Sequence, residues 1–442
     1  MGRRRAHAPL TVLINGRRTG LLEKESGGGI SFQYDPGWLA WENAFPISLS
    51  LPLQPTAWRG GPVTAVFDNL LPDNAGVRKQ VAEKTGAGGT DSYSLLEQIG
   101  RDCIGAMQFL PHGLDVEAFG EIQADPISDS EIEDLLANLA RAPLGIDPDE
   151  GFRISVAGAQ EKTALLFHEG VWKRPQGTTP TTHILKPELG ELQMEGGAVD
   201  LSHSVDNEHY CLALMKAFGL PVAGSAIATF GKRRVLVVER FDRRWREDGR
   251  LLRLPQEDLC QALSTPSSQK YQDKGGPGIR AILDRLQESD DPLRDQALFF
   301  KSQVLFWLIG ATDGHAKNFS LSLRPGGRFE LTPFYDVLTA QPAFDSKQIP
   351  HKDFRVAMSL GDRSHYRILD IHGRHFVESG RAAGLGPTLM RQVIEEVMAA
   401  ADTAPDRALA AMPADFHREA HKAITAVLPR RLRMLDTAWE AL

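Results

Sequence analysis

The polar pair Asp313 and Asn318 lies five residues apart in the segment 308–318, directly after a long apolar run. Polar side chains at the end of an apolar helix cost stability unless they serve a purpose. The spacing matches the catalytic loop of protein kinases, in which the Asp accepts the proton of the substrate hydroxyl and the Asn holds magnesium. Because such a pair also arises readily by chance, the spacing alone is a weak indication.

A second acidic residue, Asp336, follows Asn318 by 18 residues, after an apolar and aromatic approach over residues 331–335. Kinases use a downstream Asp, usually followed by Phe-Gly, to bind the magnesium ion that bridges the phosphates. Asp336 fits this role with Val337 and Leu338 in place of Phe and Gly. Taken alone, Asp336 is equally compatible with an Asp that caps a turn at a strand end.

The segment 155–163 reads Ser-Val-Ala-Gly-Ala-Gln-Glu-Lys-Thr, and the backbone N–H groups of its small residues could approach nucleotide phosphates. It is not a Walker loop, because Val156 and Glu161 stand where that motif requires glycine. Walker roles are therefore not assigned to Lys162 and Thr163. By itself the segment is more typical of a plain hairpin turn.

A cation and a carboxylate form the next candidate pair. Lys186 ends a predicted apolar strand, where kinases place a lysine that reaches the nucleotide phosphates. Glu208 lies in helical register with Cys211 and Met215, which predicts that it faces inward. An inward Glu needs a cationic partner, and Lys186 is the best candidate. The alternative is a salt bridge at the rim, worth about 0–1 kcal/mol.

The run Val235–Val238, followed by Glu239–Phe241, resembles a buried strand that leads into a hinge. In this interpretation backbone groups face adenine and Phe241 packs nearby. As a pattern alone, the run is simply a core strand. For the charged residues 242–244 we favour a solvated turn over a charge that faces the substrate.

The elements that position these residues begin with short strands at Thr11–Ile14 and Ile30–Tyr34, bounded by glycines. They are consistent with a small β-rich module. An acidic amphipathic helix is predicted at Asp129–Leu139 and a linker at Ala142–Glu150. We therefore expect a boundary near Gly151.

After this boundary the pattern predicts strands around Ser155 and at Thr163–Phe167, His183–Lys186 and Val235–Val238, with a helix at Asn207–Phe218. Beyond Leu254 the apolar spacing becomes helical, with helices at Gln256–Leu263, Gly278–Leu286, Arg294–Ile309, Thr388–Ala401 and Asp415–Glu440, the last broken by Pro429. The predicted fold class is α+β, with a β-rich N-terminal subdomain and linker helix over 1–150, a nucleotide-binding region over 151–254 and a helical lobe over 255–442.

The motif Phe67–Asp73, with the sequence Phe-Asp-Asn-Leu-Leu-Pro-Asp, has no evident chemistry. Its two aspartates could serve as functional carboxylates. Acidic residues beside proline more often build turns, however, and we favour that interpretation.

Composition limits the remaining possibilities. The 442 residues are 42% hydrophobic and 24% charged, which is typical of a folded globular protein of two or three domains. A formal net charge of −7 does not suit a dedicated nucleic-acid binder, so any DNA contact must be local or made through a partner. The basic residues Arg3–Arg5 lead to no apolar signal core, and we expect the cytoplasm.

Two further features argue against a zinc or disulfide site and against a membrane span. Cys103, Cys211 and Cys260 are too far apart for a zinc site or a disulfide framework, and we expect reduced packing residues. The longest apolar run, Ala297–Ala311, is interrupted by polar residues and is too short for a membrane span, so it predicts a buried helix and no membrane association.

Assembled in order, these segments resemble the HipA family, the toxin kinases of bacterial HipBA modules. The matching stretches cover most of the chain and are Phe67–Asp73, Ile99–Asp102, Ser155–Leu165, Thr181–Leu185, Ser204–Glu208, Val238–Arg244, Arg253–Cys260, Lys270-Tyr271, Gly275–Ile279, Trp307–Ser320 and Leu331–Val337. Each is modest alone, and together they are highly specific. The resemblance implies a two-lobed, protein-kinase-like fold.

The resemblance also implies roles for single residues. Asp313 would be the catalytic Asp, Asn318 and Asp336 would bind Mg²⁺, and Ser155 would be an autophosphorylation site that silences the kinase. The ATP-binding set would comprise Ala157, Gly158, Ala159, Gln160, Glu161, Lys162, Lys186, Glu239, Arg240, Phe241, His315, Lys317, Asn318 and Asp336. Glu208 would support Lys186 as an ion-pair partner.

The partners that the resemblance implies are a HipB-type antitoxin dimer, operator DNA reached mainly through that antitoxin, and glutamyl-tRNA synthetase as the phosphorylated protein. Direct DNA contact by this chain has less support. Arg363, Arg367 and Arg374 with His375 lie in a suitable region, but Asp362 and Asp370 dilute the charge and favour a solvated surface.

Two other functions remain open from the residues. One is a metal-dependent hydrolase with Asp313, His315 and Asp336 as ligands, since carboxylate and imidazole suit several divalent metals. The other is a kinase fold without activity that serves as a co-repressor beside the antitoxin. The intact set of Asp313, Asn318, Asp336 and Lys186 argues against the second.

Overall fold

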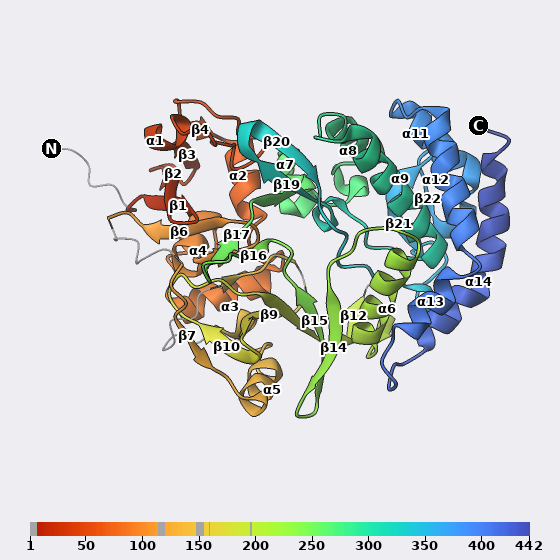
Figure 1. Cartoon of the computed structure of the whole chain (residues 1–442), viewed down its shortest axis with the longest axis horizontal. Helices are drawn as coiled ribbons and strands as arrows, with labels where there is room; N and C mark the ends of the chain where they lie inside the picture. The colour runs from red at the N-terminus through yellow and green to blue at the C-terminus, as the bar shows by residue number, and fades with distance from the viewer. Residues whose placement is uncertain (1–6, 114–119, 147–153, 159, 195–196) are drawn as a thin grey trace. The chain divides into compact units, whose positions relative to one another are not determined.

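The computed structural model describes residues 7–113, 120–146, 154–158, 160–194 and 197–442 (Figure 1). The chain forms two compact units, and each is built from three separate stretches. The first unit comprises Met1–Pro187, Thr229–Ser268 and Ser320–Phe329, and the second comprises Glu188–Ala228, Gln269–Phe319 and Glu330–Leu442. The parts 1–150, 151–254 and 255–442 expected from the sequence stay a prediction. The boundary predicted near Gly151 lies outside the described residues.

The first unit begins with a five-stranded antiparallel sheet in the order β4-β3-β2-β1-β6. The strands are β1 (Leu10–Ile14), β2 (Arg17–Lys24), β3 (Ile30–Tyr34), β4 (Trp58–Arg59) and β6 (Met107–Pro111). Asn15 and Gly16 join β1 to β2 with φ angles of 49° and 77°, which is the conformation that an Asn-Gly hairpin turn requires. The predicted strands at β1 and β3 are confirmed.

The first unit also holds a second sheet, in which β15, β11, β9, β10 and β7 are neighbours in that order. Its strands are β7 (Ala124–Pro126), β9 (Thr163–His168), β10 (Val171–Pro175), β11 (His183–Pro187) and β15 (Arg233–Glu239). The helices of this unit are α1 (Pro36–Leu39), α2 (Gly61–Asp68), α3 (Ala75–Thr85), α4 (Ser92–Ile99) and α5 (Asp129–Ala137). The predicted strands β9, β11 and β15 and the predicted helix α5 are confirmed. Ser128 and Glu131 form a capping box that starts α5.

Several short strands complete the first unit. They are β5 (Asp102–Cys103), β8 (Ile154–Ser155), β16 (Arg243–Trp245), β17 (Leu251–Arg253), β18 (Gln256–Asp258) and β19 (Ser320–Arg324), while β14 (Ser225–Phe230) and β20 (Arg328–Leu331) run from one unit into the other. The predicted strand around Ser155 is β8, which pairs in parallel with β5.

The helix predicted at Gln256–Leu263 is wrong in its first half. Gln256 to Asp258 form strand β18, paired with β19, and the helix α7 covers only Leu259–Ala262. Asp258 is the reason, because its side chain accepts the backbone N–H of Gln261 at 2.9 Å and caps the helix at that point. The residues before the cap are then free to join the sheet.

The second unit is mainly helical and is organised around α9 (Pro292–Ile309), which Figure 1 shows among α8 (Ile279–Leu286), α12 (Pro387–Ala400) and α14 (Glu419–Leu435). Nearly all of α9 from Phe299 onward is buried, as its apolar run predicted. Polar groups inside this core find partners, for example the Trp307 indole, which donates to the Ile368 carbonyl at 2.9 Å.

Helix α14 continues through Pro429, so the predicted break at this residue is wrong. Its buried residues Ala420, Ile424, Leu428, Arg431 and Leu435 recur every three or four positions and form one inward face. A proline inside a helix costs roughly 3 kcal/mol, and burial of a complete apolar face offsets that loss. The helix is also shorter than the predicted span Asp415–Glu440.

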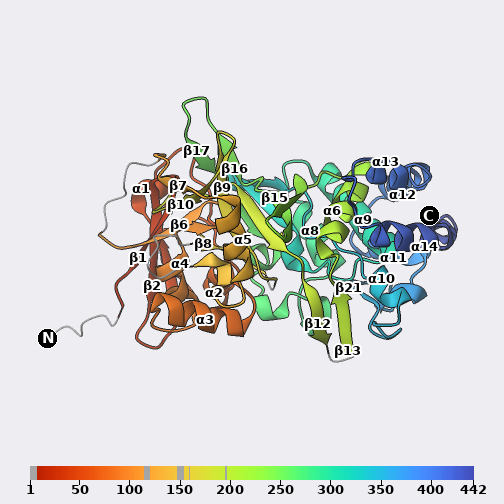
Figure 2. The same ribbon diagram turned by 90° about the horizontal axis from the view of Figure 1, so that it is seen from below.

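The other elements of the second unit are α6 (Ser204–Ala217), α10 (Gln341–Asp345), α11 (Gly373–Ala382), α13 (Ala404–Ala410), the hairpin β12 (Gly190–Met194) with β13 (Gly197–Leu201), and the hairpin β21 (Arg355–Leu360) with β22 (His365–Arg367). Figure 2 shows β12 and β13 lying side by side. Helices α6, α8, α9 and α12 confirm their predictions. Among the described residues no helix is long and apolar enough to cross a bilayer. All three cysteines are buried and free, as expected.

Candidate functional site

The segment with Asp313 and Asn318 leaves the C-terminal end of α9 in the second unit. Gly310 ends the helix in the left-handed region, with φ of 74°. The last helical carbonyls have partners, since Arg431 donates to the Leu308 carbonyl at 2.9 Å and Thr339 donates to the Ile309 carbonyl at 2.5 Å. The start of the segment is therefore anchored in the core.

Hydrogen bonds within the segment bring Asp313 and Asn318 together. The Asn318 side-chain amide donates to the Asp313 backbone carbonyl at 2.7 Å, and the backbone N–H of His315 donates to the same carbonyl at 2.8 Å. The Asp313 side chain is 58% exposed, whereas Asn318 is buried. The turn thus exposes the Asp313 carboxylate to solvent and fixes the buried Asn318 side chain on the Asp313 backbone.

His315 lies inside this turn and is buried. Its Nε2 atom is 3.9 Å from the Asp313 carboxylate, and its Nδ1 atom has no hydrogen-bond partner among the described residues. Burial lowers the pKa of the imidazole, and the charge of Lys270 lowers it further, although Asp313 and Asp336 act in the opposite direction. A neutral His315 therefore contacts Asp313 without forming an ion pair.

Asp336 belongs to the same unit and has a strained backbone. Its φ of 58° lies in the left-handed region, which residues other than glycine seldom adopt. The chain is fixed just before Asp336. Phe334 forms an isolated parallel β-bridge with Val222, and the Tyr335 hydroxyl donates to the Lys317 carbonyl at 2.9 Å. Backbone strain that the surrounding structure maintains is concentrated at functional sites. The Tyr335 contact links the Asp336 segment to the Asp313 turn.

Tyr271 is a site residue that the sequence reasoning missed. Its hydroxyl donates a hydrogen bond to the Asp313 carboxylate, and its ring meets the His315 ring edge to face at 4.9 Å. The Lys270 carbonyl accepts the backbone N–H of Ala316 at 3.3 Å. The only signal in the sequence was the dipeptide Lys270-Tyr271 among the matching stretches, which was given no role.

In the first unit, the expected nucleotide loop follows Ser155. The Ser155 side chain is fully buried, and its hydroxyl donates to the Leu70 carbonyl at 2.7 Å. Gly158 has φ of 112°, and Lys162 crosses the loop to donate to the Ala157 carbonyl at 2.9 Å. The positive φ of Gly158 favours glycine at this position, because residues with a Cβ atom seldom adopt it.

Other members of the predicted nucleotide set in the first unit have varied surroundings. The Gln160 side chain donates to the Pro187 carbonyl at 3.2 Å, and Glu161 is exposed. Ala159 lies outside the described residues. Lys186 is buried in β11, opposite Leu236 of β15.

At the end of β15, Glu239 is exposed and Phe241 is partly exposed. The Arg240 side chain is buried and donates to Asp102, Asp242, Thr181 and the Cys103 carbonyl. The backbone N–H of Arg240 also donates to the Thr182 carbonyl, at 2.9 Å, so its side chain and its N–H are both engaged inside the protein.

Glu208 lies in α6 of the second unit and is buried, as are Cys211, Met215 and Phe218. Its inward orientation confirms the helical register predicted from the sequence. The ion pair with Lys186 stays a prediction.

The interpretation of residues 242–244 as a solvated turn is wrong for Asp242 and Arg243, which are buried, while Arg244 is exposed. The physical reason is pairing inside the protein: Asp242 pairs with Arg240 and Arg243, and Arg243 also pairs with Asp102. The Asp102 carboxylate accepts hydrogen bonds from Arg243 at 2.8 Å and Arg253 at 3.0 Å. Burial alone would raise the pKa of Asp102, but these guanidinium groups hold it far below its ordinary value. The result is a buried charge cluster, formed by Asp102, Arg240, Asp242, Arg243 and Arg253.

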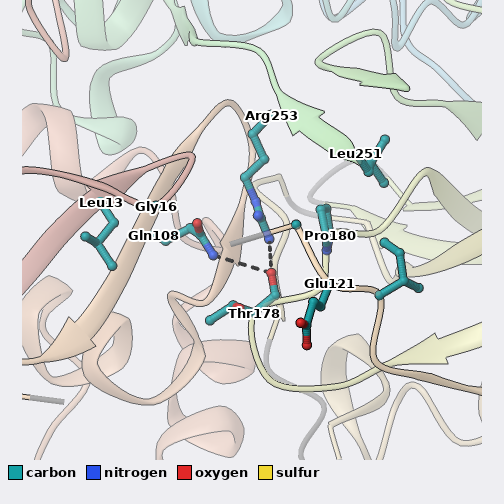
Figure 3. Close-up of a pocket in the computed structure, with 10 residues that line it drawn as sticks. Leu13, Gly16, Gln108, Glu121, Thr178, Pro180, Leu251 and Arg253 are labelled. Carbon is teal, nitrogen blue, oxygen red and sulfur yellow. Dashed lines mark hydrogen bonds between the residues drawn. The ribbon is translucent and has the colours of Figure 1, made fainter. Parts of the chain in front are cut away.

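A separate pocket of the first unit lies next to this cluster and contains none of the predicted site residues. Figure 3 shows Leu13, Gln108, Glu121, Thr178 and Arg253 among its lining. The Thr178 carbonyl accepts from both Arg253 at 2.8 Å and Gln108 at 3.5 Å. Because these donors are already engaged, the pocket offers little chemistry to a ligand.

The donor atoms of the site bear on the choice of metal. Within the described part of the chain, no group of three or more His, Cys, Asp or Glu side chains is placed to hold a metal ion. Asn318 and Asp336 offer amide and carboxylate oxygens, the hard donors that Mg²⁺ accepts alongside phosphate and water.

Comparison with known proteins gives a consistent result. The model of the HipA-like C-terminal domain matches residues 154–404, and that of the HipA N-terminal domain matches residues 10–110. The protein Y4mE of Sinorhizobium fredii is 31% identical over 393 residues, which cover 88% of this chain and 89% of that protein. The serine/threonine-protein kinase toxin HipA of Shewanella oneidensis is 32% identical over 73% of this chain and 71% of that protein.

The fold is also found among solved structures. A chain of the Shewanella oneidensis toxin–antitoxin complex of HipA, HipB and operator DNA superimposes with a TM-score of 0.78, over 98% of this chain and 99% of that chain. At 24% sequence identity, this likeness establishes a common fold.

Proposed function

The chain belongs to the HipA family, and from this premise we propose that it is a serine/threonine protein kinase that transfers the γ-phosphoryl group of ATP to a protein serine. One observation supports the proposal most strongly. The exposed Asp313 carboxylate, the buried Asn318 and the strained Asp336 lie in one unit, and hydrogen bonds connect the segments that hold them. These are the residue types that phosphoryl transfer requires.

In this mechanism, Asp313 orients the serine hydroxyl and accepts its proton. The serine oxygen forms a bond to the γ-phosphorus, the bond from that phosphorus to the bridging oxygen breaks, and ADP leaves. Mg²⁺, held by Asn318 and Asp336, would shield the phosphate charge when bound. Exposure of Asp313 suits this role, because the carboxylate must reach a protein side chain that comes from solvent.

Within the same turn, His315 and Lys317 complete the proposed nucleotide site. A neutral imidazole at His315 can donate one hydrogen bond to a phosphate oxygen without adding charge. Lys317 is held through its carbonyl by Tyr335, which fixes its backbone beside the Asp336 segment.

The remaining residues of the proposed ATP-binding set belong to the first unit, apart from Glu208 as a supporting residue. Ala157 to Lys162 would present backbone N–H groups and the Lys162 ammonium to phosphates, and Lys186 would add a second cation. Glu239 to Phe241 would frame adenine, with Arg240 contributing its backbone carbonyl, because its backbone N–H donates to the Thr182 carbonyl. In kinases a glutamate orients the strand lysine, and Glu208 is the proposed partner of Lys186.

The decisive experiment uses ATP labelled on its γ-phosphate, with wild-type protein and Asp313→Gln. We expect the wild type to label a serine of itself or of an added protein, and the variant to bind ATP with little change but to label nothing. Label released only as free phosphate would indicate a hydrolase. Absence of both nucleotide binding and labelling, with antitoxin binding kept, would indicate an inactive co-repressor.

We further propose Ser155 as an autophosphorylation site. A phosphate carries about −1.5 to −2 charges and would repel ATP phosphates from the adjoining loop. Because the hydroxyl is buried on the Leu70 carbonyl, its modification requires β8 to leave its place. Mass spectrometry of Ser155 after incubation with ATP, in wild type and Asp313→Gln, tests this step.

The partners are proposed by analogy with the Shewanella complex, which contains HipA, HipB and operator DNA. For this chain we propose a HipB-type antitoxin dimer, with operator DNA bound mainly through the antitoxin, and glutamyl-tRNA synthetase as the phosphorylated protein. Arg363, Arg367 and Arg374 are exposed, but Arg367 is paired with Asp370 at 2.6 Å and His375 is buried. Labelling of purified glutamyl-tRNA synthetase, compared with a cell lysate, tests the substrate.

A further inference from the structure

The motif Phe67–Asp73 contacts Ser155 and the segment that follows it at three points. The Leu70 carbonyl accepts the Ser155 hydroxyl at 2.7 Å, Pro72 forms a parallel bridge with Gly158, and the backbone N–H of Asp73 donates to the Gly158 carbonyl at 3.2 Å. We refer to residues 67–73 as the docking turn and to the described residues 157, 158 and 160–162 as the nucleotide loop. The docking turn therefore holds the nucleotide loop and the strand before it.

Arg78 of α3 fixes the shape of the docking turn. Its Nε atom donates to the Pro72 carbonyl at 2.6 Å, and one terminal nitrogen donates to the Asp68 carboxylate at 2.6 Å. The other terminal nitrogen donates to the second carboxylate oxygen at 3.2 Å and to the Asp68 carbonyl at 3.3 Å. A single guanidinium thus joins the start of the turn to its end, and only the planar fork of arginine reaches all these acceptors at once.

Asp68 is held in turn by two hydroxyl groups. Ser92 donates to its carboxylate at 2.9 Å and Ser267 at 2.8 Å. Burial raises the pKa of Asp68, but hydrogen bonding to Arg78 and the charge of Arg78, with the two serines, lower it below its ordinary value. The side chains of Arg78 and Asp68 are only 14% and 20% exposed, so solvent screens this pair less than an ordinary surface pair.

Apolar packing does not fill the space between the nucleotide loop and its surroundings. A pocket remains there, lined by Pro72, Val77, Leu144, Val156 and Lys162, among others. The loop is therefore restrained mainly by hydrogen bonds, which are those to the docking turn and those that Gln160 and Lys162 make to the Pro187 and Ala157 carbonyls.

We propose that Arg78 and Asp68 are positioning residues for ATP, acting through the docking turn to hold the nucleotide loop in its binding position. This inference rests on the proposed function, because it assigns the loop to ATP. It also gives the motif Phe67–Asp73 a role beyond a simple turn. When the docking turn loosens, ATP binding weakens and the Ser155 hydroxyl becomes accessible, while the Asp313 turn is unchanged.

The test compares Arg78→Ala and Arg78→Lys with Lys79→Ala, a control at the next residue of α3, whose side chain is 74% exposed. Amide hydrogen exchange of the nucleotide-free full-length protein is followed in peptides that contain Asp73 and residues 154–162. We expect exchange at least tenfold faster in Arg78→Ala, an intermediate rate in Arg78→Lys, and no change in the control. Unchanged exchange in both Arg78 variants would overturn the proposal.

Kinetics provide the second measurement. Arg78→Ala should raise KM for ATP about tenfold and change kcat less than twofold, because the transferring centre is untouched. Equal loss of kcat in Arg78→Ala and Arg78→Lys would indicate a general structural defect and contradict a positioning role. If amide hydrogen exchange in Arg78→Ala is fast along the whole chain, this variant is not folded. The proposal is then tested by amide exchange and KM for ATP in Arg78→Lys and Asp68→Asn. Absence of phosphotransfer in the wild type would refute the proposed function but leave the exchange result valid for the docking turn.

Discussion

The hydroxyl of Tyr271 donates a hydrogen bond to the Asp313 carboxylate, across 42 positions of sequence. Asp313 is otherwise exposed, so this bond is the main restraint that the described residues place on its side chain. A proposed general base works best when its lone pairs are already directed at the incoming hydroxyl. We therefore expect Tyr271 to affect the rate of phosphoryl transfer by orienting the Asp313 carboxylate.

Tyr271→Phe should lower kcat about tenfold and leave KM for ATP within about twofold, since a hydrogen bond to a charged group is worth about 1.5–3 kcal/mol. Steady-state kinetics with labelled ATP measure both constants. Tyr366→Phe, a partly exposed tyrosine of β22 in the same unit, is the matched control and should behave as the wild type. A normal kcat in Tyr271→Phe would show that the bond does not matter for transfer.

Gly314 determines how closely the Asp313 turn approaches α9. A Cβ atom at this position would lie 2.4 Å from the Phe306 ring. Gly314→Ala should therefore destabilise the protein by about 1–3 kcal/mol and displace Asp313, with a loss of activity larger than the loss of stability explains. Urea unfolding and kinetics measure the two effects.

Two further variants control this experiment. Phe306→Leu combined with Gly314→Ala should recover part of the activity, because the smaller side chain makes room. Gly88→Ala should be neutral, since no atom lies near a Cβ placed there. If the double variant is no better than Gly314→Ala, the proposed clash is not the cause.

Local patterns in the sequence predicted much of the second unit. The apolar run of α9 ends at Gly310, and the polar turn after it begins where the helix can no longer continue. Helix, cap and turn are all encoded within about thirty residues, so the positions of Asp313 and Asn318 relative to the helix follow from neighbouring residues alone.

The contacts of the site were not predictable in the same way. Tyr271 meets Asp313 only because separate loops pack together, and no periodicity marks such a tyrosine. The same holds for the docking turn, in which a motif near residue 70 meets a loop near residue 158. The discontinuous units have the same cause, since each combines three distant stretches. Changes in composition along the chain cannot reveal which distant stretches fold into one unit.

The buried charge cluster shows a different limit of prediction from the sequence. From the sequence, Asp242 and Arg243 look like a solvated turn, because charged residues are rarely buried unless they are paired. Arg243 pairs with Asp102, which lies more than a hundred residues earlier in β5, and Asp242 pairs with Arg240 and Arg243. Without the tertiary structure, no local pattern distinguishes a paired charge from a solvated one.

Asp102→Asn should destabilise the first unit by about 3–5 kcal/mol, because it leaves three buried guanidinium groups with too little compensating charge. Urea unfolding followed by tryptophan fluorescence measures the loss. Asp248→Asn is the matched control, since the pairs of Asp248 with Arg246 and Arg250 are half-exposed and an Asn keeps the oxygen that accepts the backbone N–H of Arg250; stability should change by less than about 0.5 kcal/mol. A similar result for both variants would mean that the cluster contributes no more than surface pairs.

The histidine cluster at the start of α11 should make the second unit sensitive to acid. His375 is buried, its ring stacks on His365 at 4.0 Å, and its Nδ1 atom accepts the backbone N–H of His372 at 3.1 Å. Burial, with the neighbouring charges of His365, Arg374 and His372, lowers the pKa of His375 to about 4, although Glu378 opposes the shift.

Because the pKa of His375 is lower in the folded state than the ordinary value near 6.5, the unfolded chain binds more protons between these values. The contribution of His375 to stability is therefore complete above about pH 6.5 and is lost as the pH falls toward about 4. Thermal unfolding across this range should show Tm falling with pH, and His375→Gln should flatten that dependence while lowering Tm at pH 7. His351→Gln, at a solvent-accessible histidine of the same unit, should keep the slope of the wild type. An unchanged slope in His375→Gln would assign the acid sensitivity to other groups.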